Sequence, residues 1–436
     1  MYQGLSLDQS PPEDIPFRFF LTAPFFGIIA GLYIAFEGSL ILKSSWDLNT
    51  IILTHLITLG WVAMVMFGAF YQMIPVLVGG SVTFIGFSRL IHLLYILGII
   101  SLVIGLYTFY PFFLISGVSL LTISILGFVI QAAIALLLVK AAQRPTIWAM
   151  RISVLSLFGT LSLGFLLIGN LAGWWHIPIS RGNLIGMHIT MGLFGWIGTL
   201  IMGVGFHVIP MFYITVSFPL KVAYQLLTLQ VIFLVAMPIG LFLDLDNRYL
   251  SILGLPGAVS MILFCGHIYN MIKTRKRKLK DSTILYWQTG LVFLLLSLVC
   301  VFLFLWLGDQ ELLIGFAAFF LIGFSISLTS GMLFKIVPFV IWFHRCSNMI
   351  GQPDIPLMKD ILSNKLAIKQ WWVYLASAIL LIGGLFSGLD LVVRLGGLAF
   401  LVSSLMLLGL LSKAYLLKVT KTDMTDFMKS MELKKD

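Results

Sequence analysis

Five of the seven histidines lie inside long apolar segments, where an ionisable side chain is costly and needs a defined partner. His55 lies in the segment 50–78 and His188 in the segment 183–213. If both segments are membrane helices running in the same direction, the two side chains lie within about 3 Å of the same depth. Such a pair suits an electron-transfer haem iron, which needs two strong axial ligands. The alternative is that each ring only hydrogen-bonds a backbone carbonyl or a water molecule.

Cationic and aromatic residues near the same membrane face suit the rest of a haem. Arg181 and Arg394, at the start of the segment 391–417, can donate charge-assisted hydrogen bonds to propionates, or can act only as topology anchors. Trp61 and Trp196 occupy matching positions in the two histidine-bearing segments. They are predicted either to pack between helices or to stack on a cofactor.

Further polar residues lie toward the opposite membrane face. His207 follows His188 by nineteen residues, about 28 Å along a helix, so one metal ion cannot bind both. His207, His92 and His267 are candidates for a second haem or another metal site, or are solvated residues at the interface. Lys335 lies within a span and is either a proton or quinone contact or a side chain that extends to the membrane surface.

The composition requires that these residues be carried by membrane helices. The chain of 436 residues is 60% hydrophobic and only 10% charged, with a mean hydropathy of +1.06, which excludes a soluble domain. About 20 apolar residues cross a bilayer as a helix. We predict an all-α membrane protein with twelve spans, at 18–42, 50–78, 88–109, 112–139, 148–172, 183–213, 220–243, 249–272, 283–307, 311–342, 368–388 and 391–417.

An internal repeat organises the spans into three quasi-equivalent four-helix arcs. A shift of 135 residues places Gly195, Trp196, Gly203 and Pro210 on Gly60, Trp61, Gly68 and Pro75, and a shift of 263 adds Gly323, Gly331 and Pro338. Glycines that only allow close helix packing are the alternative. We expect one polytopic membrane domain over 1–436, with repeat units at about 17–140, 148–273 and 283–417 and a cytoplasmic tail at 418–436.

The basic residues gather in the loops after even-numbered spans, above all in the run 273–280. Because Lys and Arg resist translocation, this distribution predicts that both termini are cytoplasmic and that His55 lies near the outer face. The net charge of +10 therefore reflects topology, and no nucleic-acid partner is expected. We expect a multi-pass protein of a prokaryotic-type inner (cytoplasmic) membrane, with the lipid bilayer as its principal partner.

The segment that carries His55 continues through Phe67-Gly68-Ala69-Phe70-Tyr71 to Pro75, and this pattern resembles the second helix of the catalytic subunit of the haem-copper oxidase superfamily. The nitric-oxide reductase and C-type oxidase branches are the nearest in pattern. Twelve helices in three arcs, an oxidase subunit I-like architecture, also fit. The resemblance implies that His55 is an axial ligand of a low-spin haem.

The family's copper and helix 10 histidine ligands are missing, since 220–243 and 311–342 contain no histidine and the copper motif around His188 is absent. We therefore expect haem b, one or two per chain, and no copper. The predicted function is electron transfer with quinol or a partner redox subunit or cytochrome, rather than oxygen reduction by a terminal oxidase. A redox-silent transporter or assembly subunit and a nitric-oxide-responsive haem protein are the alternatives.

Overall fold

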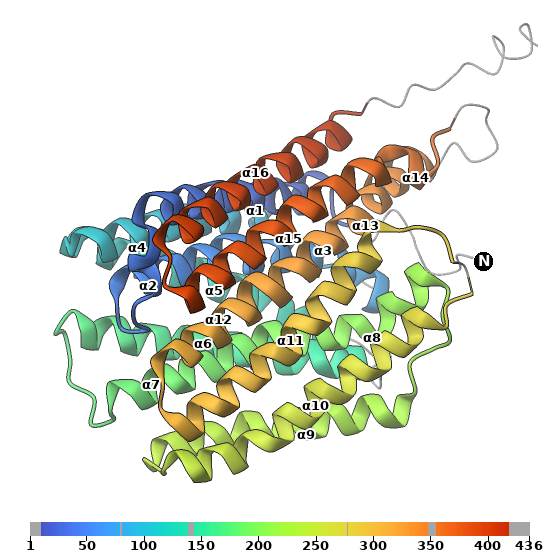
Figure 1. Cartoon of the computed structure of the whole chain (residues 1–436). Helices are drawn as coiled ribbons and strands as arrows, with labels where there is room; N and C mark the ends of the chain where they lie inside the picture. Colours follow the sequence, from blue (N-terminus) through green and yellow to red (C-terminus); the bar gives the residue numbers. More distant parts are fainter. Residues whose placement is uncertain (1–9, 79–80, 138–143, 277, 348–354, 418–436) are drawn as a thin grey trace, which may run out of the picture.

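The computed structural model describes residues 10–78, 81–137, 144–276, 278–347 and 355–417 (Figure 1), so the predicted tail at 418–436 lies outside the described residues. Three inner spans combine α-helical and π-helical segments. In chain order, the helices within the described residues are α1 (Asp14–Glu37), η2 (Gly38–Leu42), α2 (Leu48–His55), η3 (Leu56–Ala63), α3 (Met64–Val78), α4 (Phe87–Thr108), α5 (Pro111–Leu137), α6 (Pro145–Leu171), α7 (Arg181–Ile189), η4 (Thr190–Gly198), α8 (Thr199–Tyr213), α9 (Leu220–Phe242), α10 (Asn247–Lys273), α11 (Ser282–Leu307), α12 (Gln310–Ala318), η5 (Phe319–Ser325), α13 (Ile326–Arg345), α14 (Met358–Ile361), α15 (Asn364–Ser387) and α16 (Asp390–Tyr415).

The predicted all-α, twelve-span membrane protein is confirmed. Within the described ranges, twelve helical stretches are long and apolar enough to cross a bilayer, and their ends differ from the predicted ones by four residues or fewer. Each of the three inner spans, which run through η3, η4 and η5, is mostly buried. Sequence patterning missed only the short helix α14, which lies between spans.

The helices pack as three similar groups of four. The first helix of each group, α1, α6 or α11, packs against the inner span that follows it, which contains η3, η4 or η5. The third and fourth helices form the pairs α4 with α5, α9 with α10, and α15 with α16. The last helix, α16, packs along α1 (Figure 1), and α5 and α10 pack on α6 and α11, so the three groups form a closed ring.

Each inner span contains a π-helical segment at the same position of the repeat. Shifts of 135 and 263 residues carry η3 onto η4 and η5 to within one residue at each end. A π-helical turn is rare and is often found at functional sites. Its recurrence at three positions is therefore a structural observation in favour of the predicted repeat.

A side chain from the third helix of each group donates a hydrogen bond to a carbonyl of the π-helical segment. The three acceptors are related by the same shifts of 135 and 263 residues. The bonds join Tyr95 to Leu59 (3.2 Å), Gln230 to Phe194 (3.0 Å) and Tyr374 to Ile322 (2.5 Å). Water is scarce at this depth, so a side-chain donor that satisfies a main-chain carbonyl also fixes the helix that carries it.

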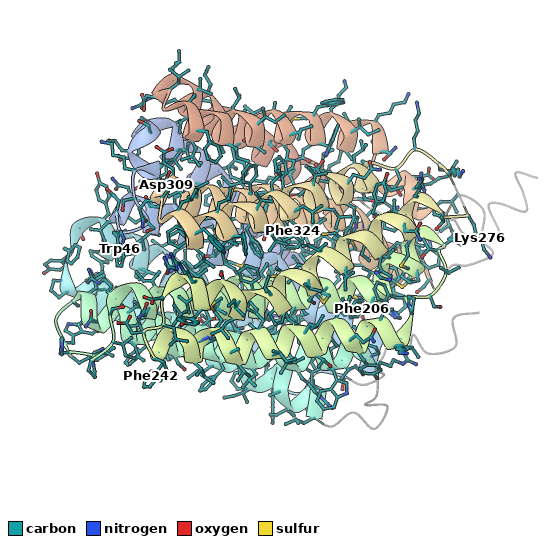
Figure 2. The ribbon with its side chains drawn as sticks, turned by 60° about the horizontal axis from the view of Figure 1, so that its bottom comes forward. Trp46, Phe206, Phe242, Lys276, Asp309 and Phe324 are labelled. Atoms are coloured by element: carbon teal, nitrogen blue, oxygen red, sulfur yellow. The ribbon has the colours of Figure 1, made fainter. Side chains whose placement is uncertain are left out.

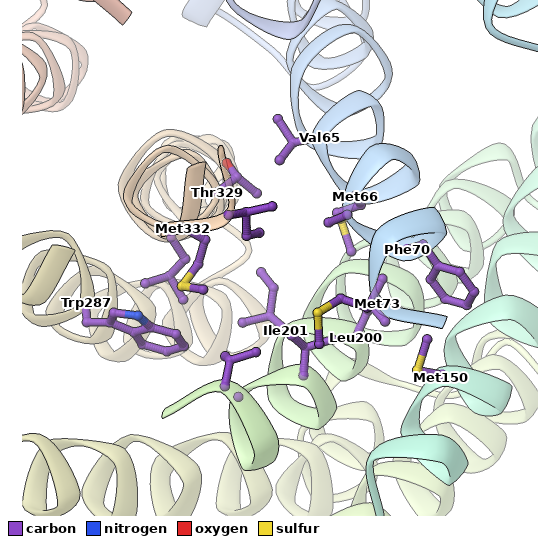
Figure 3. Close-up of a pocket in the computed structure, with 16 residues that line it drawn as sticks. Val65, Met66, Phe70, Met73, Met150, Leu200, Ile201, Trp287, Thr329 and Met332 are labelled. Carbon is purple, nitrogen blue, oxygen red and sulfur yellow. The ribbon is translucent and has the colours of Figure 1, made fainter. Parts of the chain in front are cut away.

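A small apolar cavity of about 80 Å³ lies between the three inner spans (Figure 3). Most of its lining comes in triplets related by the repeat, which places the cavity on the pseudo-threefold axis. These triplets are Val65, Leu200 and Leu328; Met66, Ile201 and Thr329; Ala69, Val204 and Met332; and Met73, Val208 and Ile336. An apolar cavity of this kind stays dry.

The repeated glycines allow each inner span to approach the first helix of its group. A β-carbon at Gly60 would lie 2.6 Å from a ring carbon of Phe26 on α1, and one at Gly195 would lie 2.6 Å from Ser156 on α6. Gly323 meets Phe293 on α11 in the same way. Close packing through small residues is how apolar helices associate in lipid.

The two ends of the bundle differ in charge. The acidic end, where Figure 2 labels Trp46 and Asp309, carries the loops after odd-numbered spans, and the basic end carries Lys276. Carboxylates at the acidic end are Glu37, Asp47, Asp244, Asp246, Asp309, Glu311 and Asp390.

Arginine side chains link α1 and α16 at both ends of the bundle. At the basic end, Arg345 forms a bidentate pair with Glu13 and donates to the carbonyls of Tyr415 and Leu417. At the acidic end, Arg394 pairs with Asp390 and donates to two carbonyls at the end of α1. Both ends of the first and last spans are thereby joined.

We expect Gly60→Leu to lower the free energy of unfolding by about 1–3 kcal/mol, because the new side chain must displace Phe26. Gly383→Leu on α15 is the matched control, since no atom lies within 4 Å of a β-carbon there, and its effect should stay within about 0.5 kcal/mol. Denaturation in detergent followed by circular dichroism measures both. Equal stability of the two variants would contradict the packing role of Gly60.

Candidate metal centre

The structure brings His55 and His188 together, although 133 positions separate them in the chain. Their ring centroids lie 6.3 Å apart and the ring planes are inclined by 30°. Both rings are half-buried and lie in the half of the bundle nearer the acidic end, just before the π-helical segments η3 and η4. The expectation that the two side chains share one depth therefore agrees with their positions.

Backbone carbonyls orient both imidazoles. Nδ1 of His55 lies 2.8 Å from the carbonyl oxygen of Ile51, and Nδ1 of His188 lies 3.0 Å from that of Thr160 on α6. A carbonyl can only accept, so each Nδ1 carries the proton and each neutral ring keeps a lone pair on Nε2. Neither Nε2 has a hydrogen-bond partner among the described residues.

This arrangement fits a metal bound between the two rings. Metal-ligating histidines characteristically donate the other ring N–H to a carbonyl or carboxylate, which fixes the tautomer. A metal about 2 Å from each nitrogen puts two opposed ring centroids about 6 Å apart. The observed 6.3 Å agrees with that spacing. The residues present therefore fit bis-histidine ligation of a haem iron.

The surroundings of the pair are neutral. The hydroxyls of Thr54 and Thr58 donate to carbonyls one turn earlier on their own span, at 2.8 and 2.7 Å. The hydroxyl of Thr58 is therefore already engaged, and the carbonyl of Ile51 orients His55. On α6, Gly164 leaves room for the ring of His188, since a β-carbon there would lie 3.2 Å from Cε1.

Capped helix starts hold the two short helices that carry the histidines. Asp47 accepts from the backbone N–H of Asn49 at the start of α2, and Ser180 accepts from that of Asn183 at the start of α7. Asn183 also donates to Asp244 at 2.6 Å, which ties α7 to the loop before α10. The α-helical segments of these spans are short, so the caps lie close to the histidines.

The two arginines predicted to bind propionates differ in availability. Arg394 is engaged by Asp390 and by the carbonyls of Ala35 and Phe36, so its guanidinium already serves the ring closure. Arg181 is exposed at the first turn of α7 and has no partner among the described residues. It precedes His188 by seven residues, about 10 Å along the helix. Of the two, Arg181 is the one free to reach a propionate.

The two tryptophans lie in packed surroundings. Trp61 donates from Nε1 to the hydroxyl of Thr329 at 3.2 Å and packs against Phe400. Trp196 packs with Phe67 and Phe128, at centroid distances of 5.8 and 6.0 Å. These contacts agree with the packing alternative.

The histidines toward the basic end lie apart from the pair, in separate surroundings. His92 shares a hydrogen bond of 3.0 Å with Thr22 on α1, and His267 is exposed, with Nδ1 donating to Leu263 one turn earlier on its own helix. His207 is half-buried. Among the described residues, no group of three or more His, Cys, Asp or Glu side chains is placed to hold a metal ion.

Lys335 forms an ion pair with Asp281, which caps the start of α11. Its ammonium group also lies 5.5 Å from the ring centroid of Tyr213 on α8. Lys335 therefore links three helices at the basic end, instead of extending alone to the membrane surface.

Three features around the histidine pair were not assigned from the sequence. They are the carbonyls of Ile51 and Thr160, which orient the imidazoles, and the space that Gly164 leaves for the ring of His188. The Ile51 carbonyl is signalled by its spacing, one helical turn before His55. The other two depend on how α6 packs against α7, which no local pattern encodes.

No protein-family model matches the sequence, and no curated protein matches it. The resemblance to the haem-copper oxidase superfamily therefore stays a prediction from the residues of the second span.

If Lys335 is a structural residue, Lys335→Met should lower the free energy of unfolding by about 1–3 kcal/mol, because Asp281 loses its partner. The loss should be smaller in an Asp281→Asn background. A double-mutant cycle in detergent, with stability followed by circular dichroism, measures the coupling, expected to be about 0.5–3 kcal/mol. Additive effects of the two substitutions would remove the ion pair as the reason for this lysine.

Proposed function

We propose that this integral membrane protein binds one haem b between His55 and His188 and serves in electron transfer. The observation that carries the proposal is the histidine pair itself, with ring centroids 6.3 Å apart, both Nδ1 atoms bonded to carbonyls and both Nε2 atoms without a partner among the described residues. A bound haem would supply one-electron redox chemistry. Arg181 would interact with a propionate.

The protein's own groups favour electron transfer over oxygen reduction. The two imidazoles would both hold the haem iron, which suits electron transfer, and the carbonyls of Ile51 and Thr160 hold the rings in the ligating tautomer. The spans that would supply copper and haem-iron ligands in an oxidase, α9 and α12–η5–α13, carry one histidine between them, His344, next to the last residue of α13. No second metal is part of the proposal.

The proposed electron partner is a quinol, or a redox subunit or cytochrome that meets the acidic end. The pair lies in the half of the bundle nearer this end, so a partner docked there is closer to it than one docked at the basic end. Carboxylates at the acidic end can attract a basic protein surface. We further propose that this end faces outward from a prokaryotic-type inner membrane, since the basic end carries most of the cations.

The haem content of single variants tests the function. We expect the wild-type protein, expressed with haem supply, to contain about one haem per chain with a low-spin reduced-minus-oxidised spectrum. His55→Ala and His188→Ala should each lose that signal, because one axial bond is gone. His207→Ala should keep it, because that residue lies about 28 Å lower on the same span. Pyridine haemochrome analysis and electron paramagnetic resonance provide the readouts.

Thermal unfolding of the same variants separates loss of haem from loss of fold. Full low-spin signal in both His55→Ala and His188→Ala would overturn the ligand assignment and turn attention to His92, His207 and His267. A wild-type protein without haem would remove the redox proposal and leave a transporter or assembly subunit.

Cysteine labelling tests the proposed orientation of the protein in the membrane. A cysteine at His176, in the exposed loop before α7, should react with a membrane-impermeant maleimide added to intact cells, whereas one at Lys276 should not. The three natural cysteines are buried, which keeps the background low. Labelling at Lys276→Cys with none at His176→Cys would reverse the proposed topology.

A further inference from the structure

A second, larger cavity lies between the middle and last groups of helices. Its volume is about 280 Å³ and it is lined by α7, η4, α9, α10, α11 and α12, with Ser45 and Trp46 at the acidic end. It extends from Asn183 to Phe194 along one inner span, about 16 Å in depth. A site of this form can hold an elongated molecule with one end at the membrane surface.

The repeat relates this cavity to the space that holds the histidine pair. A shift of 135 residues carries His55 to Thr190, and a shift of 128 carries His188 to Phe316. Thr190 and Phe316 both line the cavity. The cavity is thus the counterpart, between the second and third inner spans, of the site between the first and second. This cavity has room for a flat molecule, but no histidine lines it that could bind a metal.

The third counterpart, between the third and first inner spans, carries Ala318 and Leu53 in these positions. Leu53 is buried in the core. Among the three related interfaces, the middle one thus combines a cavity with the absence of histidine.

The lining of the cavity suits a neutral aromatic ring. No lining residue is charged, which disfavours a phosphate head group or a carboxylate. Phe194 and Phe316 lie parallel, with centroids 5.8 Å apart and planes 7° apart, and Phe233 meets Phe194 edge-on at 5.2 Å. Flat apolar surfaces of this kind bind flat aromatic ligands.

Hydrogen-bond donors are available at the mouth. The indole N–H of Trp46 and the amide groups of Asn247 and Gln310 line the cavity, and none of these donors has a partner within the described part of the chain. The amide oxygen of Gln310 accepts from the hydroxyl of Ser45, which orients the amide. These groups can donate to acceptor oxygens of a ligand, and no cation is present to bind an anion.

We propose that this cavity binds the head group of a lipid-soluble quinone, with its carbonyl oxygens toward Trp46, Asn247 and Gln310 and its ring toward Phe194 and Phe316. The presence of the cavity and the chemistry of its lining do not depend on the proposed function. The choice of a quinone among neutral aromatic molecules rests on the proposed electron-transfer function. Binding itself needs no haem, so it is measured separately from the histidine pair.

A cavity-filling variant gives the test. A β-carbon at Gly254, which lines the cavity, meets Met237 at 3.4 Å, an ordinary contact, so Gly254→Leu should fit and fill the space. In full-length protein in lipid nanodiscs, calorimetric titration with a decyl-substituted benzoquinone should give at least about tenfold weaker binding for this variant. Trp46→Phe removes only one donor and should weaken binding about fivefold.

Gly266→Leu is the matched control, on the same helix but with no atom near its β-carbon, and should bind like the wild type. Equal binding by wild type and Gly254→Leu would overturn the site. Equal binding of decane and the quinone would also overturn the proposal and assign the cavity to lipid chains. His55→Ala should lose haem yet keep quinone binding, so absence of haem tests the metal proposal and not this one.

Discussion

Every backbone carbonyl inside a membrane must find a donor within the protein, and this constraint determines how the inner spans are held. In each of the three groups, a carbonyl of the π-helical segment accepts from a side chain on the third helix, with Tyr95, Gln230 and Tyr374 as donors. The inner spans are thereby fixed against rotation just past the level of His55 and His188. Orientation of the candidate ligands depends on these bonds as much as on the bonds to their own Nδ1 atoms.

The three repeated groups share a backbone geometry but carry different side chains at their interfaces. The same backbone geometry recurs three times, yet a histidine pair is present at one interface, Thr190 and Phe316 at the second, and Ala318 and Leu53 at the third. The central cavity on the pseudo-threefold axis is apolar and offers no ligand set. Function is thus decided by side chains at equivalent positions, which is how one fold supports several activities.

The spans and the pairing of His55 with His188 could be predicted because both depend on local patterns. Hydropathy fixes where helices start and end, and the repeat of glycines fixes their relative depth. The π-helical segments could not be predicted, since their residues read as ordinary apolar helix. Contacts between distant helices could not be predicted either, because they depend on packing angles. Examples are the contacts of Thr160 with His188 and of Asp281 with Lys335. For the same reason the sequence left Arg394 as either a propionate partner or a topology anchor and did not reveal its partners, Asp390 and the end of α1.

The closed ring has a consequence for biosynthesis. The face of α1 that carries Gly27 and Gly31 packs against α16, the twelfth described span. Spans enter the membrane in order of synthesis, so this face of α1 contacts lipid or a chaperone until α16 has been translated. The hydrogen bonds from Arg394 on α16 to Ala35 and Phe36, and those from Arg345 to Tyr415 and Leu417, can form only then. The docking of the first span on the twelfth therefore waits until every span between them has been made.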